Sequence, residues 1–255
     1  MNKIIKIIFL DILKSKIVIA YTIILAILSW SSFALEGNAS KGILTVLNVI
    51  LFTVPLVSIL FSTIYIYNSS EFIEMILSQP VKREKIWIGI FSGLSLSLCL
   101  AFLLGSGISL LVYSFDSIGF MMILMGLLIT IIFVSLACLC SILTRDKTKG
   151  IGLSIMIWLY FAILFDGIIL FLLFQFSDYP IEKTIVGITT LNPIDLARIQ
   201  ILMQLEVSAM MGYTGAIFKN LLGTSVGLLI SFVLLCLWFF VPFYISKKKF
   251  AKKDL

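Results

Sequence analysis

Long apolar stretches alternate with short charged connections along this chain. About 20 consecutive apolar residues suffice for a helix to cross a hydrocarbon core of roughly 30 Å. The hydrophobic pattern therefore predicts an all-α polytopic membrane protein with six transmembrane helices, built as a single domain over residues 1–255. The expected spans are about 17–35, 43–67, 86–113, 118–143, 151–176 and 223–246.

The residues before the first span predict an amphipathic interfacial helix over 1–16. Ile5, Ile8, Phe9 and Ile12 recur at helical spacing, with lysines on the opposite side, so the helix should lie in the membrane interface. Ser32-Phe33-Ala34 resembles a signal-peptidase site. We nevertheless expect the first span to be retained, because four lysines precede it and it is longer than a usual signal core.

The connection between spans two and three predicts a short helix over about 68–80. Asn68 or a following serine can cap its start, and Gln79-Pro80 should end it. One alternative is a helix half sunk among lipid headgroups. Anionic lipids would repel its two glutamates, which favours an acid-flanked apolar surface that fits a groove on a cytoplasmic protein. The candidate contact residues are Glu71, Phe72, Glu74, Met75, Ile76 and Pro80.

The connection between spans five and six, residues 177–222, predicts a polar helix. Asn192-Pro193 is an N-cap followed by proline at the first helical position, and the helix should end near Gly212. Its two polar stripes suit a helix wedged between neighbours. It could dock an extracytoplasmic partner or cover its own bundle. The candidate docking residues are Asn192, Pro193, Asp195, Arg198, Gln200 and Gln204.

Asp166 is the one charged side chain expected well inside a span. An ionised Asp at that depth costs roughly 2.5–3.5 kcal/mol. No Lys or Arg is expected at that depth to pair with it, and Asn48 is the candidate hydrogen-bond partner. Asp166 could line a transport path or make a structural hydrogen bond between helices.

The basic residues crowd alternate connections. The net charge is +6, and the two termini with the connections after spans two and four hold 15 of the 19 Lys and Arg residues. The positive-inside rule then predicts cytoplasmic termini, an inner-membrane location and an extracytoplasmic position for 177–222. Membrane topology explains these charges without a nucleic acid.

The sequence lacks the residue sets of several chemistries. It has no His, its four Cys fall inside apolar spans, and it has no phosphate-binding glycine motif. We therefore expect no enzyme, no metal site and no cofactor bound directly, with ATP and Mg²⁺ held by a partner. Met203 and Met210 could bind Cu(I), but packing explains them better. An intramembrane hydrolase would need paired catalytic groups that the spans do not supply.

The inner-loop sequence "EMILSQPVKREKIWIG" resembles that of ABC-2 type permeases, in which a coupling helix joins spans two and three. The outer sequence "LNPIDLARIQ", followed by "MGYTGA" at Met211–Ala216, resembles the NosY-type permeases of nitrous oxide reductase maturation. The resemblance implies a homodimer, a cytoplasmic NosF-like ATPase, a periplasmic NosD-like β-helix protein and the maturation of a copper enzyme in denitrification. It implies that the Met75 region takes force from the ATPase. An exporter of another cargo, such as a lipid, peptide or drug, is the alternative.

Overall fold

The computed structural model describes the chain except for residues 1, 36–38, 79, 177–181, 205–224 and 253–255. Every regular element among the described residues is a helix. In chain order they are α1 (Asn2–Lys14), α2 (Lys16–Leu35), α3 (Ala39–Asn68), α4 (Ser70–Leu77), α5 (Arg83–Phe102), η1 (Leu103–Gly107), α6 (Ile108–Tyr113), α7 (Ser117–Leu143), α8 (Lys147–Leu159), η2 (Tyr160–Leu164), α9 (Phe165–Gln175), α10 (Glu182–Thr189), α11 (Pro193–Gln204) and α13 (Ser225–Lys252).

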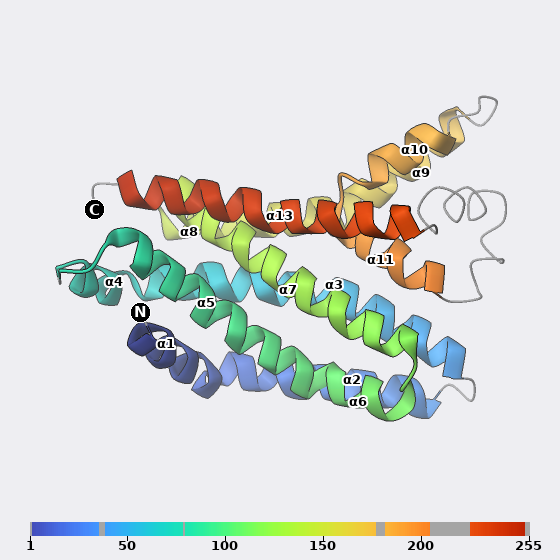
Figure 1. Cartoon of the computed structure of the whole chain (residues 1–255), viewed down its shortest axis with the longest axis horizontal. Coiled ribbons are helices and arrows are strands. Elements are labelled where there is room, and N and C mark those ends of the chain that lie inside the picture. The colour runs from blue at the N-terminus through green and yellow to red at the C-terminus, as the bar shows by residue number, and fades with distance from the viewer. Residues whose placement is uncertain (1, 36–38, 79, 177–181, 205–224, 253–255) are drawn as a thin grey trace.

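Six helices long and apolar enough to cross a membrane confirm the predicted spans. They cover Lys16–Leu35, Lys41–Asn68, Arg83–Tyr113, Ser117–Leu143, Lys147–Gln175 and Gly227–Lys252. The π-helical segments η1 and η2 continue the third and fifth spans without breaking them. The spans run along the long axis of the molecule, with α1, α4 and both chain ends at one end and α10 and α11 toward the other (Figure 1). We call these the terminal end and the outer end.

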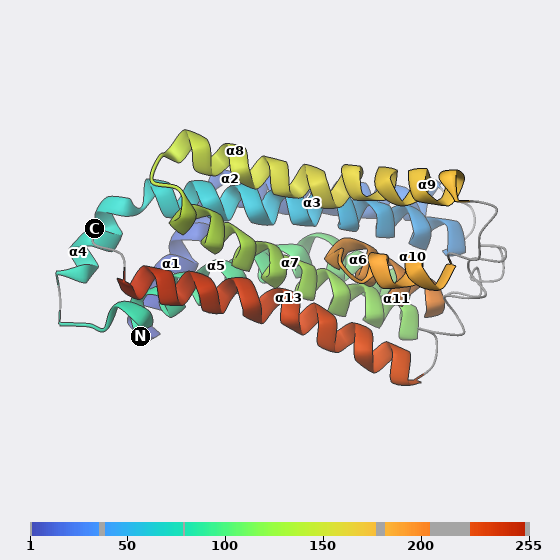
Figure 2. The same ribbon diagram turned by 90° about the horizontal axis from the view of Figure 1, so that it is seen from above.

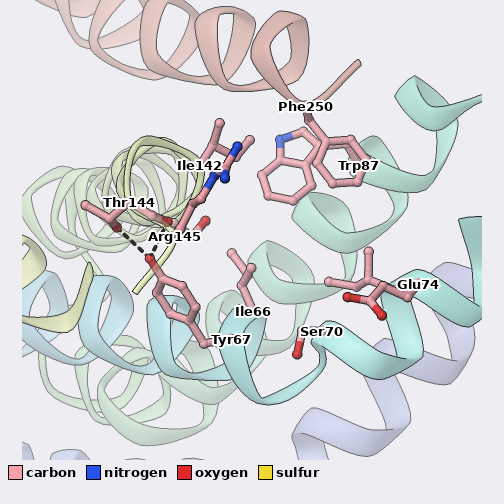
Figure 3. A pocket seen from close by; sticks show the side chains of 11 residues that line it. Ile66, Tyr67, Ser70, Glu74, Trp87, Ile142, Thr144, Arg145 and Phe250 are labelled. Atoms are coloured by element: carbon pink, nitrogen blue, oxygen red, sulfur yellow. Dashed lines mark hydrogen bonds between the residues drawn. The ribbon is translucent and has the colours of Figure 1, made fainter. Parts of the chain in front are cut away.

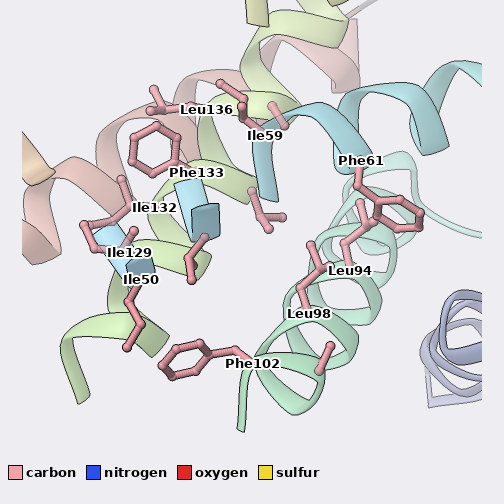
Figure 4. Close-up of a cluster of buried hydrophobic side chains, with 14 of the residues drawn as sticks. Ile50, Ile59, Phe61, Leu94, Leu98, Phe102, Ile129, Ile132, Phe133 and Leu136 are labelled. Atoms are coloured by element: carbon pink, nitrogen blue, oxygen red, sulfur yellow. The ribbon is translucent and has the colours of Figure 1, made fainter. Parts of the chain in front are cut away.

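The core lies between α3, α5 and α7. Side chains from the three helices meet there, among them Ile50 of α3, Leu98 of α5 and Phe133 of α7 (Figure 4). The continuous helix formed by α8, η2 and α9 runs along the outside of α3 (Figure 2). Its side chains are largely exposed in the isolated chain, as expected of a span that faces lipid or another subunit.

Small residues and hydroxyl groups hold the spans together. Gly105 of η1 packs directly on Leu25 of α2, and Ser29 Oγ donates to Ser106 Oγ at 2.9 Å beside it. Thr63 and Ser154 likewise share a hydrogen bond of 2.7 Å between α3 and α8. Close backbone approach and interhelical hydrogen bonds replace the hydrophobic effect as the source of helix association in lipid.

Gly105→Ala is expected to destabilise the protein by about 1–3 kcal/mol. An added Cβ would lie 2.8 Å from Leu25 Cβ and 3.1 Å from the Thr22 carbonyl oxygen, so α2 must move away. Gly152→Ala is the matched control, because a Cβ there meets nothing within 4 Å. Thermal unfolding of the purified protein in detergent measures both. Equal unfolding temperatures for the two variants would contradict this packing argument.

The predicted amphipathic helix corresponds to α1, which packs on α5 as well as presenting apolar side chains outward. Ile8 is buried, and its Cγ2 would lie 2.6 Å from a Cβ added at Gly93. Ser97 Oγ of α5 donates to the Phe9 carbonyl at 3.3 Å. Ile7 and Leu10 remain exposed. One face of α1 therefore belongs to the bundle, and another is free to contact lipid.

Candidate functional site

Helices α10 and α11 form a hairpin that folds back into the bundle from its outer end. Asn192, in the turn between them, donates through Nδ2 to the Phe161 carbonyl at 2.9 Å. Phe161 lies in η2, about 20 Å of helix before the end of α9. At the far end of α11, Ser117 Oγ donates to Gln204 Oε1 at 3.4 Å, and Ser117 begins α7. We call α10, α11 and their turn the outer hairpin.

Asn192 organises the tip of this hairpin. Its Oδ1 accepts a 2.9 Å hydrogen bond from the Ile194 backbone N–H, which confirms the predicted N-cap before Pro193. Its Nδ2 donates to Asp195 Oδ2 at 2.9 Å in addition to the Phe161 carbonyl. The side chain is fully buried, so all its polar atoms act inside the chain. One residue thus starts α11 and fixes it to the fifth span.

Arg198 joins two carboxylates at this site. Its Nη1 lies 3.0 Å from Asp166 Oδ2 on α9 and 3.3 Å from Asp195 Oδ1 on its own helix. Asp166, Asn192, Asp195 and Arg198 are called the hairpin cluster below. Two carboxylates share one guanidinium, so the cluster carries a net charge of −1 when all three groups are ionised. Burial and then the negative charge of Asp166 raise the pKa of Asp195 to about 7, although Arg198 and Asn192 oppose this.

The prediction that Asp166 has no basic partner at its depth is wrong. Arg198 reaches it because α11 folds back between the spans, which span-by-span counting does not anticipate. Asn48, the expected partner, makes no hydrogen bond to Asp166 among the described residues. It is exposed and instead lines a cavity of about 420 Å³ with Phe52, Ala162 and Arg198. The cavity lies between α3, η2 and α11.

Four of the six candidate docking residues are buried within the chain, which corrects their assignment to a partner surface. Asn192 is 0% exposed, Asp195 5% and Gln200 2%, and Pro193 is buried beside them. Gln200 Nε2 donates to the Leu228 carbonyl of α13 at 3.2 Å. The helix therefore covers its own bundle, and of the six candidates only Gln204 and part of Arg198 remain accessible. The predicted continuation to Met211, with Met210 and the Met211–Ala216 motif, lies outside the described residues.

Helix α4 is the second candidate site. Ile73 and Ile76 are buried against the chain, whereas Met75 is 56% exposed and Glu71 and Glu74 are exposed as well. The sequence indicated that Ile76 belongs to a surface free for a partner, and its burial corrects this. Phe72 is half-buried. The caps also differ from expectation. Ser69 makes no side-chain capping bond, and Asn68 Oδ1 instead accepts from Lys147 Nζ at 2.7 Å. Exposed Pro80 follows the end of α4.

A cavity of about 350 Å³ lies behind α4. Ile73 and Glu74 of α4 line it together with side chains from the ends of α3, α5, α7 and α13 (Figure 3). Trp87 and Phe250 stack at 4.4 Å along one side, and Tyr67 Oη bonds to Thr144 on the other. Helix α4 is thus attached through its ends and two isoleucines, with space beneath it.

Comparison with known proteins places the chain in a family. Residues 3–255 match the model of the ABC-2 family transporter proteins. This chain belongs to that family. A probable ABC transporter permease protein NosY from Pseudomonas aeruginosa is 26% identical, over 74% of this chain and 76% of the relative. The protein of the same name from Stutzerimonas stutzeri is also 26% identical over the same shares.

Membership of the ABC-2 family gives the chain its general role. It is the membrane subunit of an ABC transporter, and ATP hydrolysis belongs to a partner ATPase. Sequence reasoning found every member of the hairpin cluster but did not connect Asp166 with Arg198. The sequence did contain one signal for this cluster. Asp195 and Arg198 lie three residues apart on one helix, a spacing at which an acid and a base can pair.

Proposed function

We propose that this ABC-2 permease is of the NosY kind. It would work as a homodimer with a NosF-like ATPase on the cytoplasmic side and a NosD-like β-helix protein outside, and support copper-site assembly in nitrous oxide reductase. Two relatives that bear the name NosY support this proposal. So does the motif Asn192-Pro193-x-Asp195-x-x-Arg198, whose three polar members meet in one cluster.

The observation that carries the coupling part of the proposal is the shape of α4. It presents the exposed side chain of Met75 beside two exposed glutamates, Glu71 and Glu74, at the terminal end of the molecule. Lysines and arginines are concentrated at that end, which supports a cytoplasmic position for it by the positive-inside rule. An apolar knob of this kind fits a groove on another protein, as short amphipathic helices commonly do. Force on α4 would pass to α3 and α5, which directly flank it in the chain.

The outer hairpin provides the matching element on the opposite side. Arg198 fixes it to the fifth span and Gln200 fixes it to the sixth, so relative movement of these spans must move the hairpin. Gln204, the exposed last residue of α11, would then present that movement to an extracytoplasmic partner. This replaces docking on the buried face of α11 with docking at its exposed end.

Met75→Asp is expected to reduce co-purification of the ATPase at least about tenfold, since a charge in place of an apolar knob costs more than 1.4 kcal/mol of binding free energy. The permease itself should insert normally, because Met75 is exposed. Thr148→Asp is the control: it adds the same charge at an exposed position at the terminal end. If the ATPase co-purifies with the Met75→Asp variant at the wild-type yield, α4 is not the contact with the ATPase.

The maturation role has its own test, separate from that of α4. Co-expression of the permease, its ATPase and a secreted β-helix protein encoded beside them should yield a complex of all three. An exporter of a lipid, peptide or drug would bind the ATPase without such a protein. Isolation of a permease–ATPase complex that never retains the β-helix protein would favour this alternative.

A further inference from the structure

The last turns of α13 have two faces of different character. On the inner face, Trp87 Nε1 of α5 donates to Ser246 Oγ at 2.7 Å, and Lys247 Nζ pairs with Glu84 at 2.9 Å. On the outer face, Ile245, Lys248, Lys249 and Lys252 follow the i, i+3, i+4, i+7 spacing of one helical stripe. The inner face completes the bundle, so the outer stripe is not needed for that packing.

The outer stripe forms one wall of a groove with the end of α7. This cavity has a volume of about 600 Å³. Three aliphatic side chains (Ile142, Leu143 and Ile245), the Tyr244 ring and four basic side chains (Arg145, Lys248, Lys249 and Lys252) line it; below, the apolar part is called its floor and the basic part its rim. Leu143 is 50% exposed although it ends a membrane span. We call this the basic groove.

The charge of the basic groove is not balanced within the described part of the chain. Its four cations make no ion pair there, and no carboxylate lines it. Neighbouring acids are already engaged: Asp146 accepts from the Thr148 N–H at 2.9 Å to cap α8, and Glu84 pairs with Lys247. Four like charges around one cavity repel one another, so an anion bound among them would stabilise the site.

The position of the groove selects the kind of anion. Its residues lie at the terminal ends of the α7 and α13 spans and in the connection that follows α7, and the ends of membrane spans lie near the membrane surface. The apolar stripe continues from Ile245 to Val241, which is also exposed. A free phosphate would use the rim alone, whereas a phospholipid would use both the rim and the floor. Basic pockets between spans on the cytoplasmic side suit anionic headgroups in this way.

We propose that the basic groove is a binding site for an anionic phospholipid, whose phosphate lies among Arg145 and the three lysines while an acyl chain runs along Ile142, Leu143 and Ile245. Topology signalling and the negative end of the α13 dipole also favour lysines at this helix end. These two causes explain why basic residues occur at this end of the chain, but not why Arg145, from the connection between α7 and α8, lines the same cavity as the three lysines of α13. The proposal does not depend on which cargo or partner the permease serves.

Photo-crosslinking in nanodiscs tests the site. The full chain is placed in phosphatidylcholine discs that contain a small share of photoactivatable phosphatidylglycerol, and labelled peptides are mapped by mass spectrometry. Each basic group near the membrane surface favours an anionic lipid by about fivefold in binding. Photoactivatable phosphatidylglycerol should therefore label the peptides that carry Leu143 and Ile245 at least about tenfold more than photoactivatable phosphatidylcholine does. Unlabelled phosphatidylglycerol should compete, and inorganic phosphate should not.

Variants separate the groove from general surface charge. The triple change K248Q/K249Q/K252Q should reduce labelling to the phosphatidylcholine level, and K248R/K249R/K252R should keep it. The control K82Q/K85Q/K149Q removes equal charge from exposed positions at the same end that do not line the groove. Equal labelling by both lipids, equal loss in the control, or competition by inorganic phosphate would each overturn the proposal.

Discussion

Arg198→Ala is expected to detach the outer hairpin from the fifth span and destabilise the protein by about 2 kcal/mol. Removal of one partner from a buried ion pair costs roughly 3–5 kcal/mol, because the remaining charge stays uncompensated. The value here is lower, since the Arg198 and Asp166 side chains are 32% and 36% exposed and partly screened. Thermal unfolding in detergent and limited proteolysis between spans five and six should both show the change.

Two companion variants separate the charge from the geometry. Arg198→Lys keeps the charge but not the planar donors, so it should recover only part of the stability. Arg198→Met combined with Asp166→Asn removes both members of the 3.0 Å pair and should be more stable than Arg198→Ala alone. If the Arg198→Ala variant has the unfolding temperature and the protease resistance of the wild type, the hairpin cluster does not hold the hairpin in place.

The spans and the tip of the hairpin could be predicted from the sequence because their causes are local. Hydrocarbon thickness sets the length of an apolar run, and Asn192-Pro193 carries its own capping chemistry. The structure confirms both: the six candidate spans lie where the pattern predicts, and Asn192 Oδ1 accepts from the Ile194 N–H.

The site contacts could not be predicted because they depend on how distant segments meet. Asp166 and Arg198 are 32 residues apart, and the pair exists only because α11 folds inward. The two polar stripes of α11 fit a platform or a lid equally well. Gln200 donates a hydrogen bond to the Leu228 carbonyl of α13, so its polar stripe faces the chain's own bundle and α11 covers that bundle. On α4, helical spacing grouped Ile76 with Met75, but contacts with the rest of the chain bury Ile76 and leave Met75 exposed.

The stability of the protein should fall as the pH rises from about 4 to about 7, in part because of Asp195. Burial, reinforced by the charge of Asp166, raises the pKa of this carboxyl from 3.8 to about 7. Within that window the folded protein keeps the proton and the unfolded chain has lost it. The contribution of Asp195 is therefore complete below pH 3.8 and lost as the pH approaches 7, by at most about 1.4 kcal/mol per pH unit.

Asp195→Asn isolates this contribution from all other titrations. The amide copies the neutral carboxyl, so the variant should lack the part of the pH dependence that Asp195 causes. The difference in unfolding temperature between variant and wild type should be small at pH 4, should grow in favour of the variant as the pH rises to about 7, and should then level off. Above about pH 7 an ionised Asp195 leaves the cluster with two carboxylates on one guanidinium, which the variant avoids. Parallel pH profiles for the two proteins would show that Asp195 is ionised throughout, and that Arg198 outweighs the effect of burial.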